Sequence, residues 1–180
     1  MSASLTRFVR CGLATFALIV SAILPVRAEV ISISAADFQL FCPPDPSECA
    51  TNAKDFRFNN GLLIPTDLSR FYANVPFPTN GQRVCSFTIV YQDINAGNPL
   101  VGRLLKKSSL AGTNPTGPFI VMASVQSGPG VVNTVRRTGT TIINQPVITK
   151  GAAFYIAEFV VQTINTNFLG VVIDYRPTCP

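Results

Sequence analysis

The stretch Arg83-Val-Cys-Ser-Phe-Thr-Ile-Val-Tyr-Gln-Asp-Ile-Asn95 carries the clearest structural pattern in this chain of 180 residues. Apolar side chains recur at every second position, and polar side chains lie between them. The apolar set is Cys85, Phe87, Ile89 and Tyr91, and the polar set is Ser86, Thr88 and Gln92. Such an alternation is typical of a β-strand that is buried on one face. The stretch therefore predicts a central strand that runs into a segment rich in turn formers, Asp93 to Asn98.

Short strands separated by turn formers are predicted along the rest of the chain. Their expected ranges are 29–35, 62–64, 69–75, 99–107, 119–126, 131–137, 152–164 and 169–175. Ala36 to Phe41 is expected to continue in extended form, and Thr138-Gly139-Thr140 to interrupt two strands. Ser127-Gly128-Pro129-Gly130 and Asn165-Thr166-Asn167 are predicted to be hairpin connections. Residues 152–164 are apolar on both faces, as expected of a strand buried between two layers.

The first 28 residues have the pattern of a cleaved signal peptide. Arg7 and Arg10 precede an apolar run from Leu13 to Leu24, and Val26-Arg27-Ala28 resembles a cleavage site. A membrane anchor is the alternative, but an apolar run of about 12 residues is shorter than the ~20 that span a bilayer. We therefore expect residues 1–28 to be a signal peptide and the mature protein to be secreted or periplasmic.

Residues 29–180 are expected to form one all-β domain. They lack a persuasive helical pattern, and about nine short strands favour a single β-sandwich or jelly roll. The mature chain holds 11 basic and 9 acidic residues, so its net charge is +2. This charge is too small to indicate a nucleic-acid partner. No segment of the mature chain is expected to span a membrane.

Four cysteines remain after residue 28, an even number that suggests two disulfides in an exported protein. They are Cys42, Cys49, Cys85 and Cys179. Three pairings are possible, and we favour Cys42 with Cys49, because prolines stiffen the short loop between them. Cys85 would then pair with Cys179. Zinc binding by the four thiols is the alternative, although the sequence has neither a Cys-x-x-Cys spacing nor a histidine.

The absence of histidine nearly excludes the classes of catalytic site that depend on an imidazole. Ser-His-Asp and Cys-His systems require an imidazole, and most catalytic zinc sites use one. Paired carboxylates remain possible, since glycoside hydrolysis needs only two acids. Glu158, inside the most apolar predicted strand, is the carboxyl group whose pKa burial would raise, unless it is paired or lies at the rim. The sequence predicts no catalytic set, no metal and no cofactor.

Two weaker features suggest binding sites. Asp93, Asn95 and Asn98 place oxygen-bearing side chains close together, like the start of a calcium loop, but the closing glutamate is absent and these residues are also common turn formers. A cationic patch for an acidic polysaccharide or a membrane surface is the second feature. Its candidate residues are Arg103, Lys106, Lys107, Arg136 and Arg137. Such charges also protect the edge strands of sheets from association, which is the alternative interpretation.

Aromatic residues point to the core more than to a ligand. Tryptophan is absent, and the four tyrosines, Tyr72, Tyr91, Tyr155 and Tyr175, mostly lie at positions that would serve the core. A tyrosine on the surface would still be able to stack on a sugar ring.

Several motifs together resemble a loose group of small exported bacterial β-sandwich proteins. They are Ala36-Asp-Phe38, Tyr91-Gln-Asp93, Arg103-Leu-Leu-Lys-Lys107, Val121-Met-Ala-Ser-Val-Gln-Ser-Gly128 and Gly170-Val-Val-Ile-Asp-Tyr175. The resemblance covers most of the mature chain and implies a sandwich fold and export. It carries over no catalytic residue.

The sequence thus favours a disulfide-stabilised β-sandwich that acts as a binding module or as part of a surface assembly, and not as an enzyme. Its expected partners are a second copy of itself, another exported protein or a surface glycan. The alternative function is a carboxylate-dependent hydrolase of extracellular glycans, in which Glu158 and Asp93 are candidate acids.

Overall fold

A computed structural model of the protein describes residues 28–40, 56–59, 61–65, 69–93, 99–108, 118–128, 134–161 and 166–180. All of the predicted signal peptide except Ala28 lies outside these ranges, as do Cys42 and Cys49 with their predicted disulfide. The described residues form eleven strands and one 3-10 turn, η1 (Ala35–Asp37). The predicted all-β fold class is therefore confirmed.

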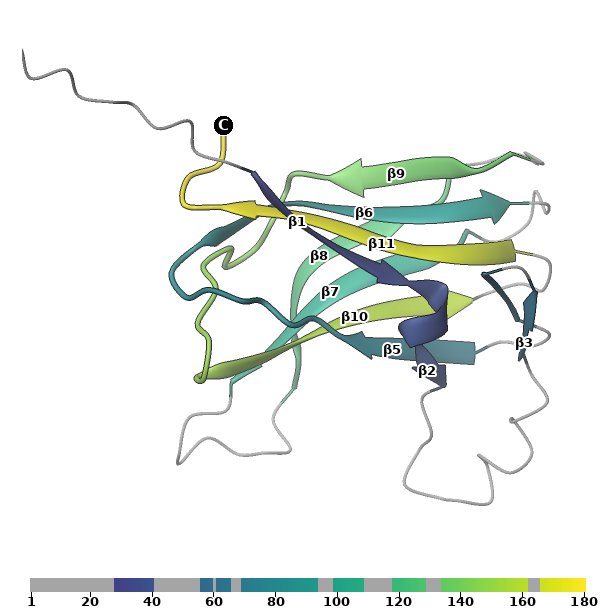
Figure 1. Ribbon diagram of the computed structural model, residues 1–180, viewed down its shortest axis with the longest axis horizontal. Coiled ribbons are helices and arrows are strands. Elements are labelled where there is room, and N and C mark those ends of the chain that lie inside the picture. The colour runs from purple at the N-terminus through teal and green to yellow at the C-terminus, as the bar shows by residue number, and fades with distance from the viewer. Residues whose placement is uncertain are drawn as a thin grey trace, which may run out of the picture.

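The strands make two antiparallel sheets that pack as a sandwich (Figure 1). The first sheet contains β1 (Glu29–Ser34), β3 (Phe56–Asn59), β4 (Leu62–Pro65), β6 (Arg83–Asp93), β9 (Arg136–Thr140) and β11 (Thr166–Arg176). The second has the order β2 (Gln39–Leu40), β5 (Ser69–Asn74), β10 (Ala153–Val161), β7 (Val101–Ser108) and β8 (Ile120–Gln126).

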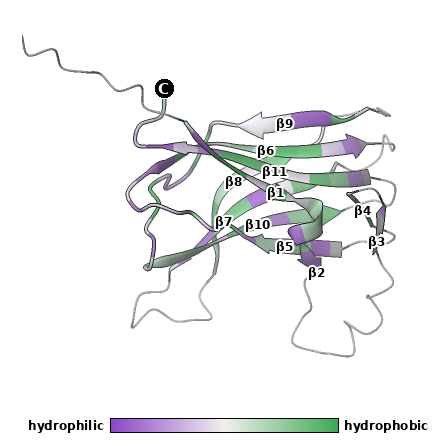
Figure 2. Ribbon diagram, viewed as in Figure 1, coloured by the Kyte–Doolittle hydropathy of each residue, from purple (hydrophilic) through white to green (hydrophobic). Residues whose placement is uncertain are grey.

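Strand β6 is an interior strand of the first sheet, between β11 and the edge strand β9, while β11 holds the middle position. Its apolar positions are buried, with Phe87 and Ile89 0% exposed and Tyr91 1% exposed. Figure 2 shows the resulting hydrophobic colour along β6 next to a more hydrophilic β9.

A disulfide joins Cys85 of β6 to Cys179, with the two Cα atoms 5.3 Å apart. This is the predicted pairing, and it excludes a zinc site made of all four thiols. The bond closes a separation of 94 residues and ties the end of the chain to β6. It constrains the unfolded chain more than it adds contacts to the folded one.

Aromatic rings join the two sheets in the core. Phe159 of β10 stacks on Phe71 of β5 with ring centroids 4.7 Å apart, and on Phe168 of β11 at 4.0 Å. Phe38, which follows η1, packs edge-on against both Phe159 and Phe168. Because Phe168 belongs to the first sheet and Phe159 to the second, this stack fixes how the sheets face each other.

Three connections differ from the sequence predictions. The hairpins predicted at 127–130 and 165–167 are wrong, because the strands on either side belong to different sheets: β8 and β9 do, and so do β10 and β11. Ala35–Asp37 forms a 3-10 turn instead of extended chain. The Ser34 side chain accepts a hydrogen bond from the Ala36 amide, and Asp37 Oδ2 accepts one from the Ser34 amide. This pair of bonds is a capping box, which stabilises a helical turn.

Two strands also differ from their predicted form. The predicted interruption at Thr138–Thr140 is wrong, because these residues continue β9, where Gly139 lies opposite Thr88 of β6. Strand β10 is not buried on both faces. Its inward side chains are buried, but Phe154 on its outer face is 65% exposed.

Gly102 of β7 marks a close approach between the two sheets. A Cβ atom at this position would lie 2.3 Å from Ile89 Cγ2, inside the core. We predict that Gly102→Ala lowers the free energy of unfolding by about 1 to 3 kcal/mol, as expected for overpacking. Urea denaturation measures this change.

Gly128→Ala is the matched control, because nothing lies within 4 Å of the corresponding Cβ position. Equal stability of the two variants would contradict the close packing of β7 on β6.

Candidate functional site

The outer face of the second sheet carries an ordered row of polar side chains. Glu158 of β10 lies opposite Tyr72 of β5 on one side and opposite Arg103 of β7 on the other. Gln39 of β2 lies opposite Tyr72 and extends the row. The row exists because side chains alternate along each strand, so the neighbours of core residues such as Phe159 point outward.

Glu158 is charged and yet only 3% exposed. Its Oε1 atom accepts a hydrogen bond from the Tyr72 hydroxyl at 2.8 Å, and its Oε2 atom accepts one from Arg103 Nη1 at 3.1 Å. Arg70 Nη1 lies farther away, 3.9 Å from Oε1. Burial of a charge is tolerated when donors satisfy it in this way. Because Tyr72 and Arg103 both donate to it, Glu158 holds these two side chains in place.

The same cluster changes the acidity of Tyr72. Burial, followed by the hydrogen bond to Glu158 and the negative charge of that carboxylate, raises the pKa of Tyr72 above its ordinary value of 10.0. Arg70 opposes this effect without cancelling it. The Tyr72 hydroxyl therefore remains a hydrogen-bond donor at neutral pH.

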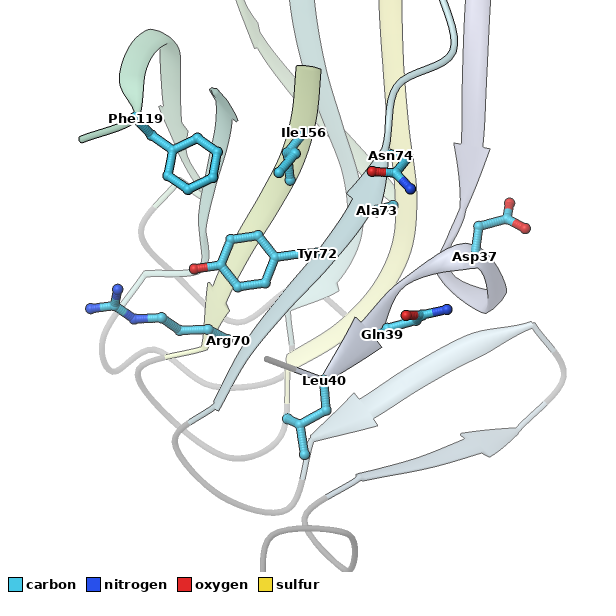
Figure 3. Close-up of a pocket in the computed structure, with 9 residues that line it drawn as sticks. All are labelled: Asp37, Gln39, Leu40, Arg70, Tyr72, Ala73, Asn74, Phe119 and Ile156. Carbon is cyan, nitrogen blue, oxygen red and sulfur yellow. The ribbon is translucent and has the colours of Figure 1, made fainter. Parts of the chain in front are cut away.

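A hollow of about 500 Å³ lies beside this row on the same face of the sheet. Figure 3 shows Arg70, Tyr72 and Asn74 along β5, with Phe119 on one side of the hollow and the η1–β2 segment on the other. The lining residues are Asp37, Gln39, Leu40, Arg70, Tyr72, Ala73, Asn74, Phe119 and Ile156. The hollow thus crosses the strands, and its size is that of a small-ligand site.

Exposed apolar side chains continue the face beyond the hollow. Phe119 is 40% exposed, Val121 45% and Phe154 65%. Lys107 lies opposite Phe154 in the strand pairing, and its Nζ atom lies 5.0 Å from the centre of the Phe119 ring. Exposed apolar side chains that are rimmed by polar residues are characteristic of interaction sites.

A second hollow of about 320 Å³ adjoins the first and shares Asn74 with it. Phe154, Phe77 and Lys150 are among its lining residues. Lys150 Nζ donates a hydrogen bond to the Pro78 carbonyl at 2.9 Å, so this lysine is held by the backbone. The larger hollow is lined by more kinds of side chain that are able to recognise a ligand.

The predicted cationic patch is divided between the two sheets. Arg103 and Lys107 lie on β7, while Arg136 and Arg137 lie on β9. Lys106 Nζ lies 5.9 Å from the centre of the Tyr155 ring. Strand β9 is an edge strand, but β7 lies between β10 and β8. Protection of an edge therefore suits Arg136 and Arg137 and does not explain the cations of β7.

The predicted calcium loop falls almost entirely outside the described residues. Asp93 ends β6, while Asn95 and Asn98 lie in the undescribed range 94–98. In the part of the chain that is described, no three carboxylate, imidazole or thiol groups meet at one point. The single helical segment of that part is the three-residue η1, so no helix there reaches the length of a membrane span.

Several residues of the hollow were not predicted from the sequence. Tyr91, Tyr155 and Tyr175 serve the core as expected, but Tyr72 points outward. Alternation along the strand predicts that Tyr72 points outward, because Phe71, Ala73 and Val75 are apolar. These three residues are buried in the structure. No local signal indicates that Phe119, which precedes β8, lies across the sheet from Asp37.

Three solved structures show distant likenesses to this fold. No protein-family model and no curated protein matches the sequence. A xylan-binding module, CBM86, from Roseburia intestinalis aligns with 83% of this chain and 96% of its own, at 10% identity and a TM-score of 0.44. TmCBM61, solved with β-1,4-galactotriose, aligns with 83% of this chain and 88% of its own, at 9% identity and a TM-score of 0.36.

A Bacillus thuringiensis Cry1Da tryptic core variant aligns with 86% of this chain, at 9% identity and a TM-score of 0.42. The aligned part spans 24% of the length of that core. Because all three TM-scores are below 0.5, these likenesses carry no argument about function.

The raised pKa of Tyr72 predicts how stability responds to alkaline pH. Above pH 10 the unfolded state loses the tyrosine proton before the folded state does, so stability falls as pH rises through the folded pKa. Below pH 10 the stabilisation by this hydroxyl is fully present. We expect Tyr72→Phe to be less stable than the wild type at pH 8 by about 1 kcal/mol.

The difference between wild type and Tyr72→Phe should shrink from pH 10 upward in urea denaturation series. A difference that stays constant up to pH 11 would show that Glu158 does not hold this proton.

Proposed function

We propose that the protein is an exported, non-catalytic binding module that holds a glycan chain on the outer face of its second sheet. The observation that carries the proposal is the hollow of about 500 Å³, which combines an exposed phenylalanine with planar polar side chains. Core packing does not account for the polar side chains of this hollow. An ordinary surface in contact with water does not account for its exposed aromatic ring.

The chemistry of the lining suits a sugar ring. The rings of Phe119 and Tyr72 offer apolar surfaces to the C–H groups of a pyranose. The amides of Gln39 and Asn74 offer both donors and acceptors to its hydroxyl groups. The hollow lies across the strands, which are spaced ~4.8 Å apart, so several strands contribute to one binding surface.

The two carboxylates nearest the hollow favour binding over hydrolysis, because both already accept hydrogen bonds from the protein. Glu158 directs both oxygens at protein donors and is 3% exposed, so it is not presented to a substrate. Asp37 Oδ2 accepts the Ser34 amide within the capping box of η1. Asp93, the other candidate acid, lies in the opposite sheet at the end of β6.

Assembly through sheet edges has less support, because three edge strands are protected. Strand β2 has only two residues, and β9 carries Arg136 and Arg137. The free edge of β8 receives hydrogen bonds from Asn144, whose amide donates to the Met122 carbonyl at 2.7 Å. Short, charged or covered edges resist pairing with another chain.

Export is part of the proposal and has two supports. The Cys85–Cys179 disulfide is of a kind that persists in oxidising compartments. Residues 1–28 have the sequence pattern of a signal peptide.

Affinity electrophoresis against a panel of neutral and charged polysaccharides tests the proposal. We expect at least one polysaccharide to retard the protein and Phe119→Ala to weaken that binding by about tenfold or more, since buried aromatic contacts dominate binding energy. Incubation should release no reducing ends.

Val30→Ala is the control, because Val30 is an apolar side chain, 58% exposed, on β1 of the other sheet. Failure of every polysaccharide to bind, or equal binding by the two variants, would contradict the proposed site.

A further inference from the structure

Positive charge exceeds negative charge on the outer face that contains the hollow. Three cations face outward there: Arg70 of β5, and Arg103 and Lys107 of β7. Strands β5 and β7, together with β10 between them, contain one acidic residue, Glu158. Asp37 lies on the far wall of the hollow, on the η1 side. The charge is therefore unevenly distributed across the hollow, with cations toward β5 and β7.

Glu158 does not use up this positive charge. Its two oxygens already accept hydrogen bonds from Tyr72 and Arg103. Arg70 Nη1 forms an ion pair with Oε1 at 3.9 Å, too long for a hydrogen bond, and the Arg70 side chain is 59% exposed. Arg70 also interacts with the Tyr72 hydroxyl. A guanidinium has five N–H donors in a flat fork, so Arg70 retains further donors for a group that enters the hollow.

The other polar residues of the hollow suit neutral, hydroxyl-bearing groups. Asn74 of β5 and Gln39 of β2 are exposed amides, and Asp37 contributes the carboxylate oxygen that does not accept the Ser34 amide. A ligand that fits the hollow carries one anionic group at Arg70 and hydroxyl groups at these residues. Arginine forks bind carboxylates in a bidentate manner and with defined orientation.

We infer that the glycan is an acidic polysaccharide built of uronic acid units, one carboxylate of which binds the Arg70 guanidinium. This inference rests on the proposed function and specifies its ligand class. The sugar ring of that unit lies over Tyr72 and toward Phe119, and its hydroxyl groups face Asn74 and Gln39. Arg103, which is bound to Glu158, adds positive potential without direct contact.

Titration calorimetry of the purified protein with three uronate polymers tests the inference: polygalacturonate, alginate and polyglucuronate. Each polymer is paired with a derivative whose carboxylates have been reduced to primary alcohols, which removes the charge and keeps the ring stereochemistry. We expect at least one uronate polymer to bind, and its reduced derivative to bind about tenfold more weakly or worse.

Arg70→Met should produce the same loss for the uronate polymer and a change below about twofold for the reduced one. Arg70→Lys keeps the charge and removes the fork, so its affinity should lie between those of the wild type and Arg70→Met. Arg137→Met is the matched control, since Arg137 is an exposed arginine on β9 of the other sheet. Thermal melting of each variant verifies that it is folded.

Equal binding of a polymer and its reduced derivative, or equal effects of Arg70→Met and Arg137→Met, would overturn the inference. If neutral glycans bind and Phe119→Ala abolishes their binding, the proposed function stands and the uronate inference falls. If dextran sulfate binds through Arg70 and no uronate does, the uronate inference is wrong. If no glycan of any charge binds, both fall together.

Discussion

The stacked contact between Phe159 of β10 and Phe168 of β11 is the constraint on which the rest of the structure depends. It joins the two sheets at a centroid distance of 4.0 Å and fixes which side chains of β10 point inward. Because successive residues of a strand point to opposite faces, Glu158 must then point outward. The pairing of β10 with its neighbours places Tyr72 and Arg103 beside it. The outer polar row is thus a consequence of the core packing.

The buried carboxylate of Glu158 explains how a flat sheet face acquires a defined shape. A charge that is 3% exposed costs free energy unless its oxygens are satisfied, and here a hydroxyl and a guanidinium satisfy them. Loss of either donor leaves one carboxylate oxygen without its hydrogen bond, which favours a single arrangement of these side chains. A preformed surface loses less conformational entropy on binding than a mobile one. Arg70, at the margin of the cluster, remains exposed beside this rigid floor.

The sequence predicts the fold better than the site, for a physical reason. Alternation along a single strand is a local property, so it predicts β6 and its buried face. The Cys85–Cys179 bridge follows once Cys42 and Cys49 are paired across their short proline-stiffened loop, which is also a local argument. Turn chemistry is also local, but it does not distinguish a hairpin from a loop that crosses between sheets, which is why the connections after β8 and β10 were misjudged. The pair Arg103–Glu158 spans 55 positions and depends on strand register, which is not a local property. The hollow has Phe119 and Asp37 on opposite walls. This placement depends on the order of the strands in the sheet, which no local stretch of sequence determines.

The central claim is that ligand binds across the outer face of the second sheet, and chemical-shift mapping tests it most directly. The measurement is a ¹H–¹⁵N correlation spectrum of the labelled protein during titration with an oligosaccharide of the polymer that binds. The account predicts that the amide signals of Gln39, Tyr72, Asn74 and Ile156 shift progressively, while those of β1, β6 and β9 stay in place. Shifts concentrated on β6 and β9, with the signals of β5 and β10 unchanged, would contradict it.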